Sequence, residues 1–147
     1  MIQSIHHTSY TVKDMDRSLP FYEQGLGFRR YSDKTVANRL QEIITGVKDA
    51  TARVVHLQGH GQGLELFQYF APQGRRDRAV SPYDVGSSHM CFIVEDIDRM
   101  REHLKGLGAE FLSEPQIVEG GPNAGNRYCY FLDPDGIPME LSQRAEK

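Results

Sequence analysis

Two histidines and two glutamates are the residues of this sequence best suited to chemistry. His7 and His89 lie at the start of two similar segments, HHTSYTVKDMDRS and HMCFIVEDIDRM, while Glu65 and Glu140 lie in LELFQ and MELSQ. Alone, each would usually be a surface residue. Gathered together, the carboxylates would repel each other, and a divalent cation removes that penalty while accepting imidazole nitrogen and carboxylate oxygen. The set predicts a site for one divalent ion, which would be Ni, Co, Zn, Mn or Fe(II).

An internal repeat relates these four residues to one another. The second copy follows 82 residues after the first, from His7 to His89, and a GLG triplet recurs near the end of each copy. A repeated unit fixes the architecture of a chain, so each half is expected to carry one histidine early and one glutamate late. The residues that recur are His7, Val12, Asp14, Asp16 and Arg17, at His89, Val94, Asp96, Asp98 and Arg99.

Each half reads as a βαβββ module. Asp14 and Asp96 are expected to cap helices that run to about Gln24 and Leu107. Further strands are expected at residues 28–32, 52–58 and 64–70 in the first half, and at residues 110–113, 127–132 and 137–143 in the second. The sequence therefore predicts a single α+β domain over residues 1–147, with a first module at 1–71, a connecting loop at 72–86 and a second module at 87–147.

The alternation of side chains along a strand predicts where the four residues point. His7 shares a face with Ser9 and Thr11, and His89 lies opposite Met90, Phe92 and Val94. Each glutamate likewise lies opposite its two apolar neighbours. Because a helix should cover the apolar face, the histidines and glutamates are expected on the uncovered face, where they would converge if the modules pair into one curved sheet.

Composition and turns exclude several other classes of protein. The net charge of -3 gives no basic surplus for nucleic acid, and no apolar run approaches the ~18 residues of a membrane span. The sequence begins without a signal peptide pattern, so we expect a cytoplasmic protein.

GHGQG, at residues 59–63, lacks the lysine and helix of a phosphate loop and is expected to be a hairpin turn. Cys91 and Cys129 are expected to be buried, reduced thiols.

The segments IHHTSYTVKDMDRSLPFYEQGLGF, LELFQ, SSHMCFIVEDIDRM and YFLDPDGIPMEL resemble the vicinal oxygen chelate superfamily. That group includes glyoxalase I, methylmalonyl-CoA epimerase, extradiol dioxygenases, and the fosfomycin and bleomycin resistance proteins. The resemblance covers nearly the whole chain. It implies two βαβββ modules that form an incomplete, open barrel around the site.

Carried over residue by residue, the metal ligands implied by the resemblance are His7, Glu65, His89 and Glu140. A carboxylate at Glu65 is similar to glyoxalase I, because the epimerase branch more typically has glutamine there. The implied activity is that of a lyase or isomerase of the glyoxalase I type, in which a base removes a proton next to a carbonyl and the metal stabilises an enediolate. Glu140 is the leading candidate for the base and Glu65 is its alternative, or both are ligands only.

Other functions and binding residues stay open. A methylmalonyl-CoA-epimerase-like isomerase, an Fe(II) extradiol-type dioxygenase and a non-catalytic binding or resistance protein are the alternatives. Phe67 and Tyr69 share a face with Glu65 and would form either a wall for a small-molecule substrate or core packing. The resemblance also implies a homodimer, with a site built within one chain or shared between two swapped chains.

Three further features have a structural interpretation beside the functional one. Arg75, Arg76 and Arg78 would either meet the charges of a thiol conjugate such as glutathione or CoA, or simply be solvated. The segment 34–50 is expected to hold a short amphipathic helix that covers the pocket or forms a dimer contact. The remaining histidines, His6, His56, His60 and His103, are assigned to the surface or the core.

Overall fold

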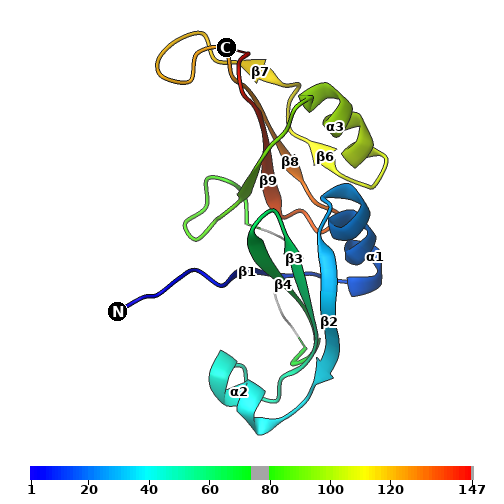
Figure 1. Ribbon diagram of the computed structural model, residues 1–147. Helices are drawn as coiled ribbons and strands as arrows, with labels where there is room; N and C mark the ends of the chain where they lie inside the picture. Colours follow the sequence, from blue (N-terminus) through cyan, green and yellow to red (C-terminus); the bar gives the residue numbers. More distant parts are fainter. Residues whose placement is uncertain (74–79, 147) are drawn as a thin grey trace. The chain divides into compact units, whose positions relative to one another are not determined.

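The computed structural model describes residues 1–73 and 80–146 (Figure 1). Contacts along the chain divide it into two compact units, Met1–Asp77 and Arg78–Lys147. Each unit has its own sheet of mixed parallel and antiparallel strands, and neither sheet closes on itself. The predicted α+β fold of two βαβββ modules is confirmed. Arg75, Arg76 and Arg78, the cationic residues expected in the connecting loop, lie outside the described residues.

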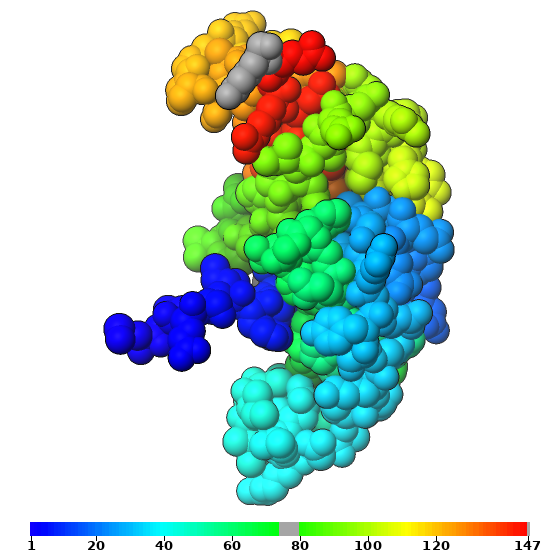
Figure 2. Space-filling model, viewed as in Figure 1, coloured from blue at the N-terminus to red at the C-terminus, as the bar shows by residue number. Residues whose placement is uncertain are grey.

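The first unit follows the predicted order, and the short helix expected within residues 34–50 is present as α2. Its sheet has the strand order β1-β4-β3-β2, in which β1 and β4 are parallel and the other pairs are antiparallel. Helix α2 carries Leu40, Ile43 and Ile44 on its exposed surface and protrudes in cyan in Figure 2. The elements are β1 (His7–Thr11), α1 (Met15–Pro20), the π-helix η1 (Phe21–Gly25), β2 (Arg29–Val36), α2 (Arg39–Thr45), β3 (Thr51–Gly59) and β4 (Gln62–Ala71).

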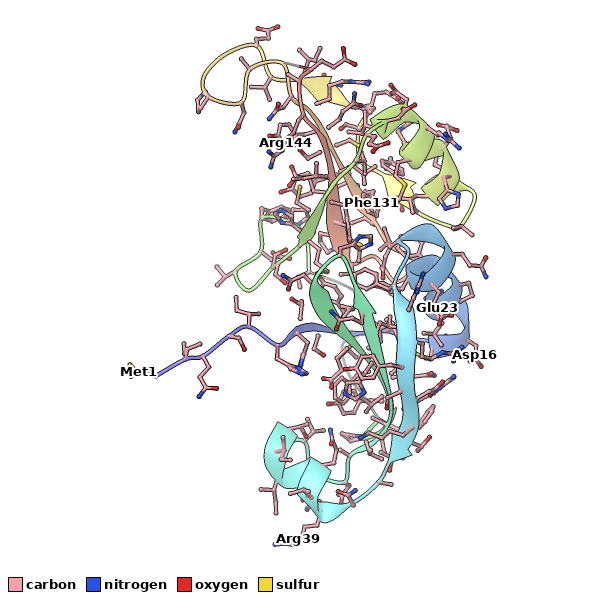
Figure 3. All side chains as sticks on the ribbon, in the orientation of Figure 1. Met1, Asp16, Glu23, Arg39, Phe131 and Arg144 are labelled. Atoms are coloured by element: carbon pink, nitrogen blue, oxygen red, sulfur yellow. The ribbon has the colours of Figure 1, made fainter. Side chains whose placement is uncertain are left out.

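The second unit repeats the pattern with shorter strands. Its sheet has the order β5-β9-β8-β6, with β5 parallel to β9, and the two-residue strand β7 also pairs with β8. Phe131, labelled in Figure 3, is fully buried and stacks on Phe111 at 5.1 Å between ring centroids. The elements are β5 (Met90–Ile93), α3 (Ile97–Lys105), β6 (Glu110–Phe111), β7 (Gln116–Ile117), β8 (Arg127–Leu132) and β9 (Pro138–Gln143).

The helix starts agree with the predicted aspartate caps. The Asp14 carboxylate accepts the backbone N–H of Asp16, and the Asp96 carboxylate accepts that of Arg99. Helix α1 of the first unit ends at Pro20, before the expected end near Gln24. Proline has no N–H to donate to the preceding turn, so the regular α-helix ends there and a π-helix carries the chain on to Gly25.

The GHGQG turn is formed as the sequence predicts, and DPDG, at residues 133–136, forms a second turn. His60 and Gly61 both have positive φ, 52° and 73°, which places the GHGQG segment in a tight turn of the primed kind between β3 and β4. In the second unit, the Asp133 carboxylate accepts the backbone N–H groups of Asp135 and Ile137 and so closes the DPDG turn. These two turns set the register of the strands that carry Glu65 and Glu140.

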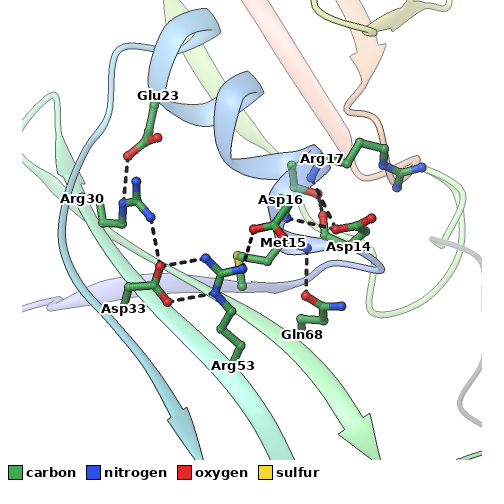
Figure 4. A network of polar contacts seen from close by, with 10 residues as sticks. Asp14, Met15, Asp16, Arg17, Glu23, Arg30, Asp33, Arg53 and Gln68 are labelled. Carbon is green, nitrogen blue, oxygen red and sulfur yellow. Dashed lines mark hydrogen bonds and ion pairs between the residues drawn. The ribbon is translucent and has the colours of Figure 1, made fainter.

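A network of ion pairs ties α1 and η1 to β2 and β3 of the first sheet (Figure 4). Arg53 on β3 binds Asp33 on β2 at 2.8 Å and Asp16 on α1 at 2.6 Å. Arg30 binds the same aspartate and also Glu23. The hydrogen bond from Arg53, together with Arg30, lowers the pKa of Asp33 to about 2, against the opposing effect of burial. The network therefore stabilises the charged form of this carboxylate.

Candidate functional site

Burial alternates along β1 as parity predicts and leaves His7 exposed. Tyr10 and Val12 are buried beneath the helix layer, whereas His7, Ser9 and Thr11 are exposed. Glu65 on the neighbouring strand β4 lies between the buried residues Leu64 and Leu66 and points to the same open face. The two predicted residues meet there, with the His7 Nε2 3.6 Å from the Glu65 Oε2.

A third residue, His56, also contacts the Glu65 carboxylate. It lies directly across the β3–β4 ladder from Glu65, and its Nε2 is 2.7 Å from the Glu65 Oε1. The two side chains are only 20% and 14% exposed. A carboxylate can only accept, so His56 Nε2–H is the donor. His56, which the sequence assigned to the surface or the core, is partly buried and contacts the candidate ligand Glu65, a contact that the repeat pattern does not indicate.

The second unit forms the equivalent histidine and glutamate pair. His89 Nε2 lies 3.2 Å from Glu140 Oε2, and the glutamate side chain is 16% exposed between the buried residues Met139 and Leu141. Cys91 lies across the β5–β9 ladder from Glu140. Although this residue is exposed, its thiol is partly desolvated, which together with the Glu140 carboxylate raises the pKa of the Cys91 thiol to about 12.

The expectation of two buried cysteines is confirmed for Cys129 and is wrong for Cys91. Cys91 shares its face of β5 with the exposed residue Ile93, while the partly buried residues Met90 and Phe92 face the other way. Strand alternation therefore places this thiol on the uncovered face, beside the glutamate.

Tyr130 occupies in the second unit the place that His56 holds in the first. It lies across the β8–β9 ladder from Glu140, yet its hydroxyl is 3.1 Å from Nε2 of His89. The two rings are 4.9 Å apart. Burial raises the pKa of Tyr130, and the nearby Glu140 carboxylate adds to the effect. Sequence reasoning did not single out this tyrosine.

An aromatic surface adjoins Glu65, as the parity of β4 predicts. Phe67 and Tyr69 stack with ring centroids 5.5 Å apart and an interplanar angle of 14°. Burial raises the pKa of Tyr69; a hydrogen bond with Thr45 acts in the opposite direction, and the charge of Glu65 adds a smaller increase. Since Thr45 is the last residue of α2, this helix ends against the aromatic pair.

The donor types fit a divalent ion. Considering residues 1–73 and 80–146, no three His, Cys, Asp or Glu side chains within a unit gather closely enough to hold a metal ion. Each unit offers one imidazole nitrogen and one carboxylate oxygen, at His7 with Glu65 and at His89 with Glu140. Imidazole and carboxylate together suit first-row divalent metals, so the residue chemistry agrees with the ion that the sequence predicts.

The repeat, the two βαβββ units and the matched histidine and glutamate pairs define a protein of the vicinal oxygen chelate type. The chain belongs to the glyoxalase/bleomycin resistance protein/dioxygenase superfamily, whose family model matches residues 4–141. Among the helices that the structure describes, none is long and apolar enough to cross a membrane.

Similar sequences carry several different names. The chain is 34% identical to a 2-epi-5-epi-valiolone epimerase of an Actinomyces species, a match that covers 94% of this chain and 78% of that one. It is 29% identical to the uncharacterised protein YwkD of Bacillus subtilis, covering 98% and 99% of the two chains. A lactoylglutathione lyase of Arabidopsis thaliana is 26% identical over 95% of this chain, which spans only 44% of that enzyme.

Solved structures show the same fold. A glyoxalase family protein from Bacillus cereus has a TM-score of 0.86 at 22% identity, covering 99% of this chain and 97% of that one. A fosfomycin resistance protein from Mesorhizobium loti has a TM-score of 0.61 at 19% identity, covering 100% and 94%. At these sequence identities the structural similarity shows the fold alone.

Proposed function

We propose that this protein is a divalent-metal-dependent isomerase that removes and returns a proton next to a carbonyl group of a small molecule. The observation that carries the proposal is the pairing of His7 with Glu65 and of His89 with Glu140 at repeat-equivalent places. A divalent ion held by these four residues would act as a Lewis acid toward the oxygen on which negative charge develops. Ni, Co, Zn and Mn suit this role.

Glu140 is the residue that we assign to the proton transfer. Its carboxylate lies on the open face of β9 beside His89, and it is partly buried between Met139 and Leu141. A carboxylate that is shielded from water but still reachable by a small molecule can take a proton from a carbon acid and return it. Glu65 is the symmetric alternative in the first unit.

An epimerisation of a ketone is the reaction within this class that we favour. The Actinomyces relative, 34% identical over nearly the whole of this chain, is named for epimerising a valiolone, and that substrate name denotes a ketone. Inverting a centre next to a carbonyl requires the same proton removal and return that the site supports. Phe67 and Tyr69 would then contact the carbon skeleton of the substrate beside Glu65.

A glyoxalase I type lyase is the second candidate. Glu65 is a carboxylate where the epimerase branch more typically has glutamine, and lactoylglutathione lyases are among the similar sequences. This candidate would take a thiol conjugate as its substrate. It uses the same proton transfer, so the same experiment addresses both candidates with different substrates.

The test is hydrogen exchange at the carbon next to a carbonyl, followed by proton NMR in deuterated water. The metal-loaded protein would be offered cyclic and open-chain hydroxyketones, and hemithioacetals of thiols, in separate reactions. We expect exchange with at least one class, its loss in Glu140→Gln with metal retained, and no change in the exposed control Glu119→Gln. Absence of exchange with every class, together with oxygen uptake on catechols, would instead favour a dioxygenase.

We further propose that the protein is cytoplasmic and that it is a homodimer, the latter as the family resemblance implies. The exposed apolar residues Leu40, Ile43 and Ile44 on α2 are available for a contact between copies. Light scattering of the purified protein at several concentrations measures the oligomeric state directly. A mass of one chain at every concentration would contradict the dimer.

A further inference from the structure

The two halves of the repeat differ in the residue that lies across the hairpin from each glutamate. In the first unit Glu65 has His56 as its cross-strand neighbour, and in the second unit Glu140 has Tyr130. The backbone geometry is the same, since both glutamates face their neighbours across an antiparallel hairpin ladder. The side chains are not the same, and they contact different members of the site.

In the first unit the cross-strand neighbour, His56, contacts the glutamate. His56 Nε2 lies 2.7 Å from Glu65 Oε1, whereas His7 Nε2 lies 3.6 Å from the other oxygen, Oε2. The two oxygens of this carboxylate are therefore divided between two histidines. With Oε1 occupied by a hydrogen bond, Oε2 is the oxygen left on the side of His7.

In the second unit the cross-strand neighbour, Tyr130, contacts the histidine instead of the glutamate. The Tyr130 hydroxyl lies 3.1 Å from His89 Nε2, and Glu140 in turn lies 3.2 Å from the same nitrogen. The Tyr130 phenol and the Glu140 carboxylate both lie against Nε2 of His89, so here the neighbouring strand contacts the histidine and not the glutamate. The residue opposite Glu140 on β8 is Tyr130, so Glu140 has no cross-strand histidine that corresponds to His56.

The local fold of β2 explains how His56 is kept in place. The β2–β3 ladder has a register shift between Arg30 and Ser32, which leaves Tyr31 out of the regular pairing. A bulge of this kind redirects a side chain, and the Tyr31 ring packs at 5.7 Å from the His56 ring. The His56 Nδ1 is buried and has no hydrogen-bond partner among the described residues. Nε2 is thus the ring nitrogen that acts, and it acts on Glu65.

We propose that His56 is a positioning residue: by holding Oε1 of Glu65 it leaves Oε2 as the one oxygen of this carboxylate that can bind the metal, and it thereby distinguishes Glu65 from Glu140. The inference rests on the proposed metal-dependent function and adds to it a residue outside the four-ligand set. Groups that orient a metal ligand in this way typically change metal affinity by about 10- to 100-fold when they are removed.

The test compares the Zn²⁺ affinity of metal-stripped proteins by competition with a chelator. His56→Phe removes the donor, and we expect Zn²⁺ binding weaker by about 10- to 100-fold. His56→Gln keeps an N–H group at nearly the same reach and is expected to restore most of the affinity. His103→Phe, a change at an exposed histidine on α3, is the matched control and should bind like the wild type.

A double-variant comparison separates positioning from a general effect on the fold. In a Glu65→Ala background, adding His56→Phe should cause no further loss of Zn²⁺ affinity, because the carboxylate that His56 holds is gone. Equal losses in both backgrounds would mean that His56 acts on the fold rather than on Glu65, and would overturn the proposal.

Nitrogen NMR of the histidine rings in the wild-type protein gives a readout that needs no variant to fold. We expect His56 Nε2 to carry its proton both without and with Zn²⁺. A shift of this nitrogen to the metal-bound type on addition of Zn²⁺ would make His56 a ligand itself and would overturn the positioning role. A wild type that binds no Zn²⁺ fails the proposed function, whereas normal binding by His56→Phe fails only this inference.

Discussion

Gln143, the last residue of β9, accepts a hydrogen bond from the backbone N–H of Ile97 at 2.9 Å. Gln68 on β4 makes the same bond to the backbone N–H of Met15, also at 2.9 Å. Each glutamine lies three residues after the glutamate of its unit, and each bond ties that strand to the first residue of a helix. The repeated glutamine therefore joins the strand that carries a candidate ligand to the helix that covers its buried face.

Replacing Gln143 by leucine should destabilise the protein by about 1 kcal/mol, because the first N–H of α3 loses its acceptor. Gln143→Glu keeps an oxygen in place and adds a charge that favours a helix N-terminus, so it should cost little or stabilise. Urea unfolding followed by circular dichroism measures both changes. Equal losses in the two variants would show that packing, and not the hydrogen bond, is what the glutamine contributes.

Gly63 is the position where β4 lies closest to the start of β1. A Cβ there would be 2.6 Å from the His6 carbonyl oxygen and 3.1 Å from the His7 Cβ, and Gly63 pairs with His7 in the sheet. Gly63→Ala should therefore displace β1, lower stability by about 1 to 3 kcal/mol and weaken metal binding. Thermal unfolding and chelator competition report the two effects.

Gly120→Ala is the control for that substitution, because a Cβ at Gly120 would meet no atom within 4 Å. The prediction fails if Gly63→Ala leaves metal affinity unchanged while it lowers stability, since the strand would then have moved without moving His7.

The ion pairs around Asp33 predict a defined pH dependence of stability. The pKa of Asp33 is lowered from its ordinary 3.8 to about 2, chiefly by the hydrogen bond from Arg53. The stabilisation is thus fully present above about pH 4 and is lost as the pH falls through about 2. Asp33→Asn should cost about 1 to 2 kcal/mol at pH 7, the side chain being partly exposed.

Denaturant unfolding of the wild type and Asp33→Asn between pH 7 and pH 2 measures this difference. The two free energies of unfolding should converge as the pH approaches 2, whereas the exposed control Glu119→Gln should track the wild type throughout. A gap between wild type and Asp33→Asn that stays constant down to pH 2 would show that Asp33 stabilises the fold by something other than its charge.

Much of this architecture could be predicted from the repeat and from strand alternation. Strand alternation is a short-range pattern, the repeat is visible in the sequence itself, and the turn at His60 and Gly61 fixes the register of the hairpin that carries Glu65. The same reasoning placed Phe67 and Tyr69 on one face, where they stack. The predicted domain boundaries and the convergence of all four ligands stay predictions.

The parts that sequence reasoning missed depend on side chains from separate strands. Counting back from the hairpin turns would have put His56 opposite Glu65 and Tyr130 opposite Glu140, but the repeat pattern draws no attention to either residue because the two differ. The bulge that brings Tyr31 against His56, and the π-helix after Pro20, leave no periodic signal in the sequence. The two-residue strand β7 was also missed, since so short a segment has no detectable alternation.

The most direct test of the account is elemental analysis of the purified protein after metal stripping and competitive reloading with Ni, Co, Zn and Mn. The account predicts roughly one divalent ion per chain in the wild type, retained in His103→Ala and lost in the His7→Ala, His89→Ala double variant. Metal retained in the double variant, or no metal in the wild type, would contradict the claim that the paired histidines and glutamates form a metal centre.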